Sequence, residues 1–201
     1  MLEFTTCLLD KNIEADRVTQ AKSWRRGEET YMLGINYRGS RILVDEIGEG
    51  EITKTSSYKD EEGVLHAGDR APDSPGLRII GSNTMPTRLF DIYRPVYHTI
   101  LVFTDDKDYA LPVVSVFKGF PVPIVRTVIV HPANGQAVVF GADMDVVDSE
   151  GHAYRCYGIE ETWKTVIVRP DGVVGAIVAG IEGVKKYFGL IFTEDVQRYL
   201  R

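Results

Sequence analysis

Two short apolar runs in the second half of the chain constrain its fold more than any other feature. Residues 97–103 (YHTILVF) and 124–130 (IVRTVIV) are rich in β-branched and aromatic residues, and each has the length of one buried strand. The segment between them, residues 109–117, has apolar residues at helical spacing, with Pro112 acceptable only in its first turn. A strand, a helix and a second strand in this order predict a parallel βαβ unit.

A β-hairpin is expected to follow this unit. Residues 165–168 and 173–178 flank a turn in which Pro170 and Asp171 suit the central positions and Gly172 supplies a positive φ. The remaining expected elements are a strand at 77–80 and helices at 87–93, 180–189 and 194–201. A βαβ unit joined to a hairpin and flanked by helices is the thioredoxin arrangement. The expected fold class is therefore α/β, a thioredoxin-like fold with a central mixed sheet and flanking helices.

One polar stretch divides the chain. Residues 45–63 combine acidic residues, serines and glycines, a composition typical of a linker. Residues 1–24 can form one apolar helical stripe. We therefore expect an N-terminal helical extension at 1–44, a linker at 45–63 and the thioredoxin-like domain at 64–201.

Composition excludes several classes of function. The net charge of −6 leaves no basic surface for nucleic acid or for an anionic membrane, and no apolar run approaches the roughly 18 residues of a membrane span. The N-terminal residues lack the basic start of a signal peptide. Cys7 and Cys156 lie far apart and form no CxxC motif, so we expect a reduced cytoplasmic protein with two free thiols.

The motifs of flavin and thiol chemistry are missing. The string nearest to a dinucleotide fingerprint, Gly48–Thr53, lacks the third glycine and carries two glutamates where a phosphate would sit, so no cofactor-binding residue is expected. A thioredoxin has a CxxC after its first core strand, but here Thr104–Tyr109 contains no cysteine. We expect its carboxylates to cap the next helix.

Metal and catalytic sites are not predicted either. The four histidines, which lack metal-site spacing, are His66, His98, His131 and His152. His98 lies in an apolar run and is expected to be a core or edge histidine. Three acidic residues lack the glycine and distal glutamate of a calcium loop and are expected in a solvated loop; they are Asp143, Asp145 and Asp148. Catalytic residues therefore remain unknown.

Six short strings occur in a fixed order along the chain. They are GINYRGS at 34–40, GDRAPD at 68–73, RLFD at 88–91, HTILVF at 98–103, YRCYG at 154–158 and VRPDG at 168–172. Together they resemble the phenol hydroxylase family of flavin-dependent aromatic monooxygenases, over the end of its flavin region and its C-terminal thioredoxin-like domain.

The resemblance implies a domain without redox chemistry. In that family a large N-terminal region binds FAD and the phenol, whereas the C-terminal domain lacks redox cysteines and contributes to the dimer. Here only the end of the first region, through Ser40, has a counterpart, so no FAD-binding residue carries over. The position of the cis-proline of ordinary thioredoxins is occupied by Thr162, Trp163 and Lys164.

Two functions remain open. The first is a non-redox dimerisation or interaction domain that pairs with itself or with a flavin monooxygenase subunit, and that is not catalytic alone. The apolar segment 113–123 is expected to supply the contact if part of it is exposed, unless the N-terminal helix covers it. The alternative is a stand-alone binder, or a cofactor-free cyclase or isomerase, acting on a small aromatic or polyketide-like molecule. Met1 and the N-terminal helix agree with a complete short protein, and a fragment of a longer chain stays open as well.

Overall fold

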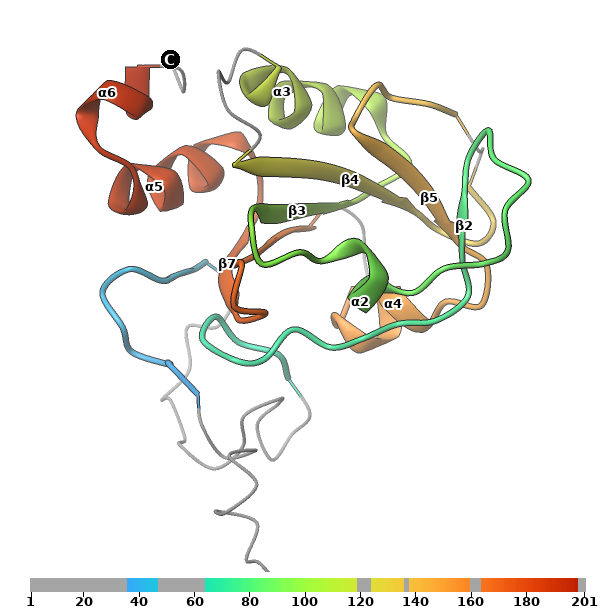
Figure 1. Cartoon of the computed structure of the whole chain (residues 1–201), viewed down its shortest axis with the longest axis horizontal. Coiled ribbons are helices and arrows are strands. Elements are labelled where there is room, and N and C mark those ends of the chain that lie inside the picture. The colour runs from blue at the N-terminus through green and yellow to red at the C-terminus, as the bar shows by residue number, and fades with distance from the viewer. Residues whose placement is uncertain (1–35, 47–63, 119–123, 136–137, 160–163, 199–201) are drawn as a thin grey trace, which may run out of the picture. The chain divides into compact units, whose positions relative to one another are not determined.

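The described part of the chain forms one mixed β-sheet flanked by helices (Figure 1). The computed structural model describes residues 36–46, 64–118, 124–135, 138–159 and 164–198. Its strands are β1 (Val44–Asp45), β2 (Leu77–Ile79), β3 (His98–Phe103), β4 (Val125–His131), β5 (Met144–Asp148), β6 (Lys164–Val168) and β7 (Val174–Val178). Its helices are α2 (Leu89–Ile92), α3 (Lys107–Phe117), α4 (His152–Cys156), α5 (Ile181–Ile191) and α6 (Glu194–Gln197).

Strand β3 lies at the centre of the sheet, whose order is β1-β7-β6-β3-β4-β5-β2. It pairs in parallel with β4, to which α3 connects it, and antiparallel with β6 of the hairpin. Strand β5 continues the parallel side, and β2 closes that edge in the antiparallel sense. The predicted βαβ unit, the hairpin and the central mixed sheet are confirmed.

The alternation of side chains along β3 supplies a core on each face of the sheet. Leu101 and Phe103 belong to a cluster shared with residues of α2 and α4. Ile100 and Val102 belong to a second cluster shared with residues of α3 and α5. Successive residues of a strand point to opposite faces, so one apolar strand can serve both clusters. Accordingly, α3 and α5 cover one face of the sheet, and α2 and α4 cover the other (Figure 1).

The hairpin turn has the predicted geometry. Gly172 adopts a φ of +79°, in the left-handed region that glycine enters without steric cost. Its N–H donates to the Arg169 carbonyl at 2.9 Å, and the Val173 N–H donates to the Asp171 carboxylate at 3.2 Å. The turn therefore depends on the backbone preference of Gly172 and on the side chain of Asp171.

Helix α3 begins two residues earlier than predicted, which changes the place of Pro112. Asp106 caps the helix, so Pro112 lies in its second turn and not in its first, as expected. Proline at this point removes the N–H that would bond to the Asp108 carbonyl. Both residues are exposed, so water can satisfy that carbonyl. The solvent-facing position explains why the helix tolerates this proline.

The prediction of a solvated acidic loop holds for Asp143, which is exposed and precedes strand β5, but it is wrong for Asp145 and Asp148. These two residues are buried within β5. Asp145 accepts the Phe140 N–H at 3.0 Å, and Asp148 accepts the N–H groups of His152 and Tyr154, each at 3.0 Å. Asp148 thus holds the start of α4, a helix that the sequence patterns did not predict. Backbone N–H donors satisfy carboxylates whose burial would otherwise be costly.

Strand β1 is a further element that the sequence did not predict. Val44 and Asp45 pair in parallel with Ala176 and Ile177 of β7. The division into an extension at 1–44, a linker at 45–63 and a domain at 64–201 stays a prediction, but residues 36–46 contact the domain. The helix expected at 1–24, most of the linker, residues 119–123 and the Thr162–Trp163 pair lie outside the described residues. Within the described residues, no helix has the length and apolar character required to cross a membrane.

Two fully buried tyrosines differ in how their hydroxyl groups are satisfied. The Tyr157 hydroxyl donates to the Pro72 carbonyl at 2.8 Å and lies 2.5 Å from the Tyr93 hydroxyl. The Tyr187 hydroxyl is buried and has no hydrogen-bond partner among the residues that the structure describes. It lies close to the backbone of Gly175, where a Cβ atom would be 2.3 Å from it. Burial raises the pKa of both phenols.

Removal of the two hydroxyls should therefore have opposite effects. Tyr157→Phe should lower the free energy of unfolding by about 1–3 kcal/mol, because it leaves the Pro72 carbonyl without a donor. Tyr187→Phe should leave stability unchanged or raise it by about 1 kcal/mol, because no hydrogen bond is lost. Urea denaturation of the two variants makes the comparison. Equal destabilisation by both changes would contradict the difference in hydrogen bonding.

Candidate functional site

The position of the thioredoxin redox motif is occupied here by a helix cap. Strand β3 ends at Phe103, and the following Thr104 hydroxyl accepts the Asp106 N–H at 2.9 Å. The Asp106 carboxylate in turn accepts the Asp108 N–H at 2.8 Å at the start of α3. These hydrogen bonds confirm the predicted capping role. A hydroxyl and carboxylates in this role provide no thiol for redox exchange.

The other residues considered from the sequence do not gather into one site. Cys156 is a free, half-buried thiol on α4, whereas Cys7 lies outside the described residues. His152 is paired with the exposed Glu150 at 2.8 Å. His131 is fully buried, and its Nε2 lies 3.5 Å from the Asp145 carboxylate. Among the described residues, no group of three histidine, cysteine, aspartate or glutamate side chains could hold a metal ion.

His98 lies beneath helix α5 within an aromatic cluster. Its ring centroid is 5.5 Å from that of Phe188 and 5.9 Å from that of Tyr187, both in edge-to-face geometry. Burial lowers the pKa of His98 from 6.5 to about 4, and the positive charge of Arg169 adds to this effect. A neutral histidine packed between aromatic rings agrees with the expected core role.

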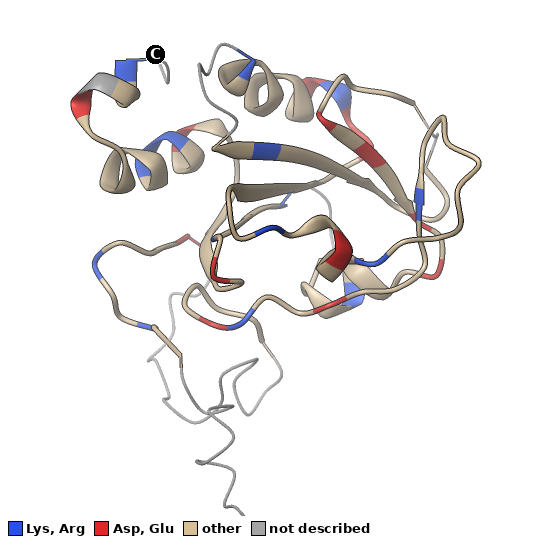
Figure 2. Cartoon of the chain, viewed as in Figure 1, with Lys and Arg blue, Asp and Glu red and all other residues tan. Residues whose placement is uncertain are grey.

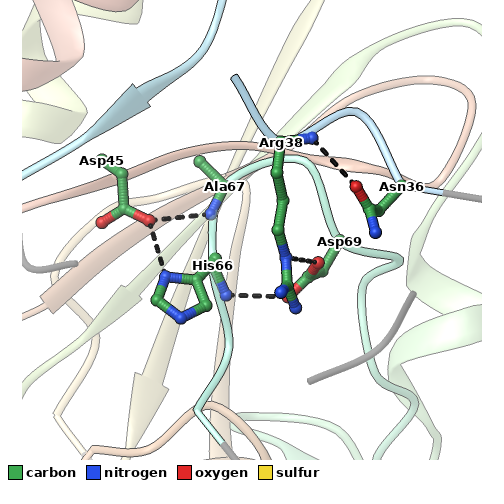
Figure 3. A network of polar contacts seen from close by, with 6 residues as sticks. All are labelled: Asn36, Arg38, Asp45, His66, Ala67 and Asp69. Atoms are coloured by element: carbon green, nitrogen blue, oxygen red, sulfur yellow. Dashed lines mark hydrogen bonds and ion pairs between the residues drawn. The ribbon is translucent and has the colours of Figure 1, made fainter. Parts of the chain in front are cut away.

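A polar network joins residues 36–46 to the loop at 66–69 (Figure 3). Arg38 donates from Nε and Nη2 to the two Asp69 carboxylate oxygens, at 2.6 and 2.8 Å. The Arg38 side chain is 2% exposed and that of Asp69 is not exposed at all. Such a bidentate pair is the strongest form of charge-assisted hydrogen bond. It therefore ties together two of the six strings singled out in the sequence, at 34–40 and 68–73.

The backbone strengthens this junction. Asp69 also accepts the His66 N–H at 2.9 Å, and Asp45 accepts the Ala67 N–H at 2.9 Å (Figure 3). A Cβ atom on Gly68 would lie 2.5 Å from the backbone nitrogen of Arg38, so only glycine lets the two backbone segments come this close. The carboxylates are engaged in holding backbone, which indicates a structural junction and not an acid–base site. Both strings are visible in the sequence, but their contact is visible only in the folded chain.

A hollow of about 360 Å³ lies beside α2 and the hairpin turn. Its walls are formed by three segments of chain, which contribute Arg70–Ala71, Phe90, Tyr93–Pro95 and Pro170–Gly172. The sequence patterns did not bring these segments together. Their juxtaposition follows from the bridge between Arg70 and Val173, which places the GDRAPD string beside the turn.

The family comparison matches the sequence motifs. Residues 112–196 match the family described as "Phenol hydroxylase, C-terminal dimerisation domain". The matched segment runs from α3 through the hairpin to α6, and it includes the YRCYG and VRPDG strings. The resemblance to the phenol hydroxylase family is thereby confirmed. Among curated proteins, no match to this chain was found.

Similar solved structures are of two kinds. One is the thioredoxin domain of a thiol-disulfide oxidoreductase from Bacteroides vulgatus, with a TM-score of 0.52 and 12% identity, covering 64% of this chain and 99% of that domain. It shows the thioredoxin-like fold.

The other kind is represented by aklavinone-11 hydroxylase with FAD and aklavinone, with a TM-score of 0.50, 22% identity and coverage of 87% of this chain. A second example is the flavin-dependent monooxygenase PieE with FAD and substrate, with a TM-score of 0.51, 18% identity and coverage of 84%. The chain spans only 27% and 25% of these two enzymes, respectively.

Loss of the Arg38–Asp69 pair should be strongly destabilising. Arg38→Met leaves the Asp69 carboxylate buried and unpaired, so we expect a loss of about 3–5 kcal/mol in the free energy of unfolding. The double variant Arg38→Met/Asp69→Leu removes both charges and should recover part of this loss.

A surface ion pair serves as the matched control for this measurement. Lys185→Met breaks the exposed pair with Glu182, at 3.7 Å, and should change stability by no more than about 0.5 kcal/mol. Urea unfolding of all three variants provides the comparison. An Arg38→Met variant as stable as Lys185→Met would show that the junction contributes nothing to stability.

The lowered pKa of His98 predicts a specific dependence of stability on pH. The unfolded chain takes up the proton near pH 6.5, whereas the folded chain resists it down to about pH 4. The stability that neutral His98 contributes is therefore complete above pH 6.5 and is lost as the pH falls towards 4. His98→Phe should flatten the fall in melting temperature across this interval, and the exposed His152→Gln should not. Parallel melting curves for wild type and His98→Phe would disprove the assignment.

Proposed function

We propose that this chain is a non-redox interaction domain of the flavin-dependent phenol hydroxylase family, which self-associates or binds a flavin monooxygenase subunit. The observation that carries the proposal is the match of residues 112–196 to a domain described by its role in dimerisation. The helix cap at Thr104–Asp108 supports the non-redox part, since carboxylates and a hydroxyl replace the thiols there. We further propose that the chain works in the cytoplasm.

The proposal assigns no FAD site to this chain. Its support is the incomplete fingerprint at Gly48–Thr53, which lies outside the described residues, and the fact that the chain spans about a quarter of two FAD-bound hydroxylases. The monooxygenase activity of those enzymes is not carried over. In this proposal the chain supplies a contact surface, and catalysis belongs to a partner with a flavin.

The described part of the apolar segment expected to supply the contact is mostly buried, and residues 119–123 lie outside the described residues. Val113, Val114 and Phe117, which begin the apolar segment 113–123, are buried in the core of the domain. Phe117 packs edge-to-face against Phe188 of α5, with ring centroids 5.2 Å apart. Much of this apolar segment is thus buried by packing against helix α5 and is not exposed for a contact with another chain.

Other apolar side chains are exposed within the matched segment. Among its described residues, the large exposed ones are Val138 at 44%, Val139 at 59% and Leu190 at 49%. Exposed apolar groups are favoured at contacts between proteins when they gather into a patch. We propose that the loop bearing Val138 and Val139 contributes to self-association.

Light scattering over a range of concentrations tests this function. We expect a mass of about twice 22.5 kDa at high concentration, and a shift towards 22.5 kDa in Val139→Asp. Val96→Asp is the matched control, because Val96 is 70% exposed but lies outside the matched segment. A wild-type mass of 22.5 kDa at every concentration, together with no binding to a flavin monooxygenase, would refute the interaction role.

The second candidate is a stand-alone binder of a small molecule. The observation that favours it is the hollow beside α2, whose volume of about 360 Å³ falls in the range of small-ligand sites. The one carboxylate among its lining residues, Asp171, is paired with Arg169, and this favours a binding role over a cyclase or isomerase.

A further inference from the structure

The hollow beside α2 combines cationic and aromatic walls. Arg70 and Arg94 contribute the cationic side, and Phe90 and Tyr93 contribute the aromatic side. Backbone pairing holds Arg70 in place, since its neighbours bond to the hairpin through Ala71 N–H to Gly172 O at 2.9 Å. The backbone of Arg70 is therefore held against the hairpin.

The two arginines are not neutralised by the acidic residues nearby. Helix α2 carries the acidic Asp91, and basic residues lie on the segments beside it (Figure 2). Asp171, the acidic residue that lines the hollow, is paired with Arg169 at 2.7 Å. Within the described part of the chain, neither Arg70 nor Arg94 forms an ion pair, and Arg94 donates only to the Tyr93 carbonyl, at 2.9 Å.

Arg70 also has an unmet hydrogen-bonding requirement. Its Nε–H is buried and has no acceptor among the described residues. A buried charged donor without an acceptor is unfavourable, and a carboxylate can accept two parallel bonds from one guanidinium. Because this Nε–H is inaccessible to solvent, an anion in the hollow would have to meet the guanidinium through its Nη groups.

The aromatic wall is held rigidly. The Tyr93 hydroxyl is engaged with that of Tyr157 at 2.5 Å, so Tyr93 presents its ring to the hollow and not its hydroxyl. The Phe90 ring is half exposed and lies 6.2 Å from the Tyr93 ring, tilted by 49°. Pro95 and Pro170 add stiff apolar surface. A planar ring can pack here with little loss of conformational entropy in the protein.

We infer that this hollow binds a small aromatic carboxylate, with the carboxylate on Arg70 and Arg94 and the ring against Phe90 and Tyr93. A neutral phenol would leave the two guanidinium groups without a charged acceptor, and an aliphatic acid would lack the contact with the rings. The binding site goes beyond the proposed interaction role and does not depend on self-association.

Titration calorimetry of the full chain at constant ionic strength tests the inference, with benzoate as the probe. Phenol and cyclohexanecarboxylate test the need for the charge and for the ring. We expect saturable binding of benzoate, with affinity for each of the other two lower by about tenfold or more.

Substitution of the arginines identifies the site. Arg70→Gln and the exposed Arg94→Gln should each weaken benzoate binding by about tenfold, while Arg78→Gln on β2, which bonds to Ser149, should not. Arg94→Gln keeps the test valid if Arg70→Gln fails to fold. The inference is overturned if benzoate shows no saturable binding, if phenol binds equally well, or if Arg94→Gln binds as tightly as wild type.

Light scattering of the same samples separates this inference from the proposed function. Benzoate binding by a chain that stays at 22.5 kDa would support the ligand site and count against the interaction role. A dimer that binds no benzoate would support the interaction role and contradict the ligand site.

Discussion

The burial of strand β3 on both faces is the constraint on which the rest of the structure depends. Its backbone is paired with β4 along its whole length and with β6 from Thr99 to Phe103. Its side chains enter two separate apolar clusters, one beneath α2 and α4 and the other beneath α3 and α5. A polar side chain in the middle of this strand would lie in one of these apolar clusters without a hydrogen-bond partner. The helices on each face can dock only because β3 presents an apolar surface to both.

The same scaffold explains how a thioredoxin-like domain can exist without thiol chemistry. The end of β3 and the start of α3 must be joined by a turn that caps the helix, whatever its chemistry. Thr104 and Asp106 perform this capping with a hydroxyl and a carboxylate. The fold therefore keeps its geometry when the redox residues are absent, and other surfaces become available for function. The hollow at Arg70 lies on such a surface.

Most strands were predictable, including β2, whereas β1 and β5 were not. Strands β3 and β4 and the hairpin were predicted because each contains a run of consecutive apolar residues, many of them β-branched. Strand β5 was missed because Asp145 and Asp148 interrupt its pattern, and those carboxylates are buried only by virtue of backbone donors on other segments. Strand β1 was missed because two residues form no pattern, and its pairing with β7 comes from a distant part of the chain.

The sequence by itself determined the class of fold, the hairpin turn at Gly172 and the absence of a cysteine after the first core strand. Each of these follows from local chemistry: β-branched runs, a backbone that needs a positive φ, and the presence or absence of a side chain. Only the tertiary structure decided that Arg38 meets Asp69, and that Arg70 lies beside Tyr93 and the turn. Those contacts join segments separated along the chain, and their partners are selected by strand pairing and packing, which no local pattern encodes.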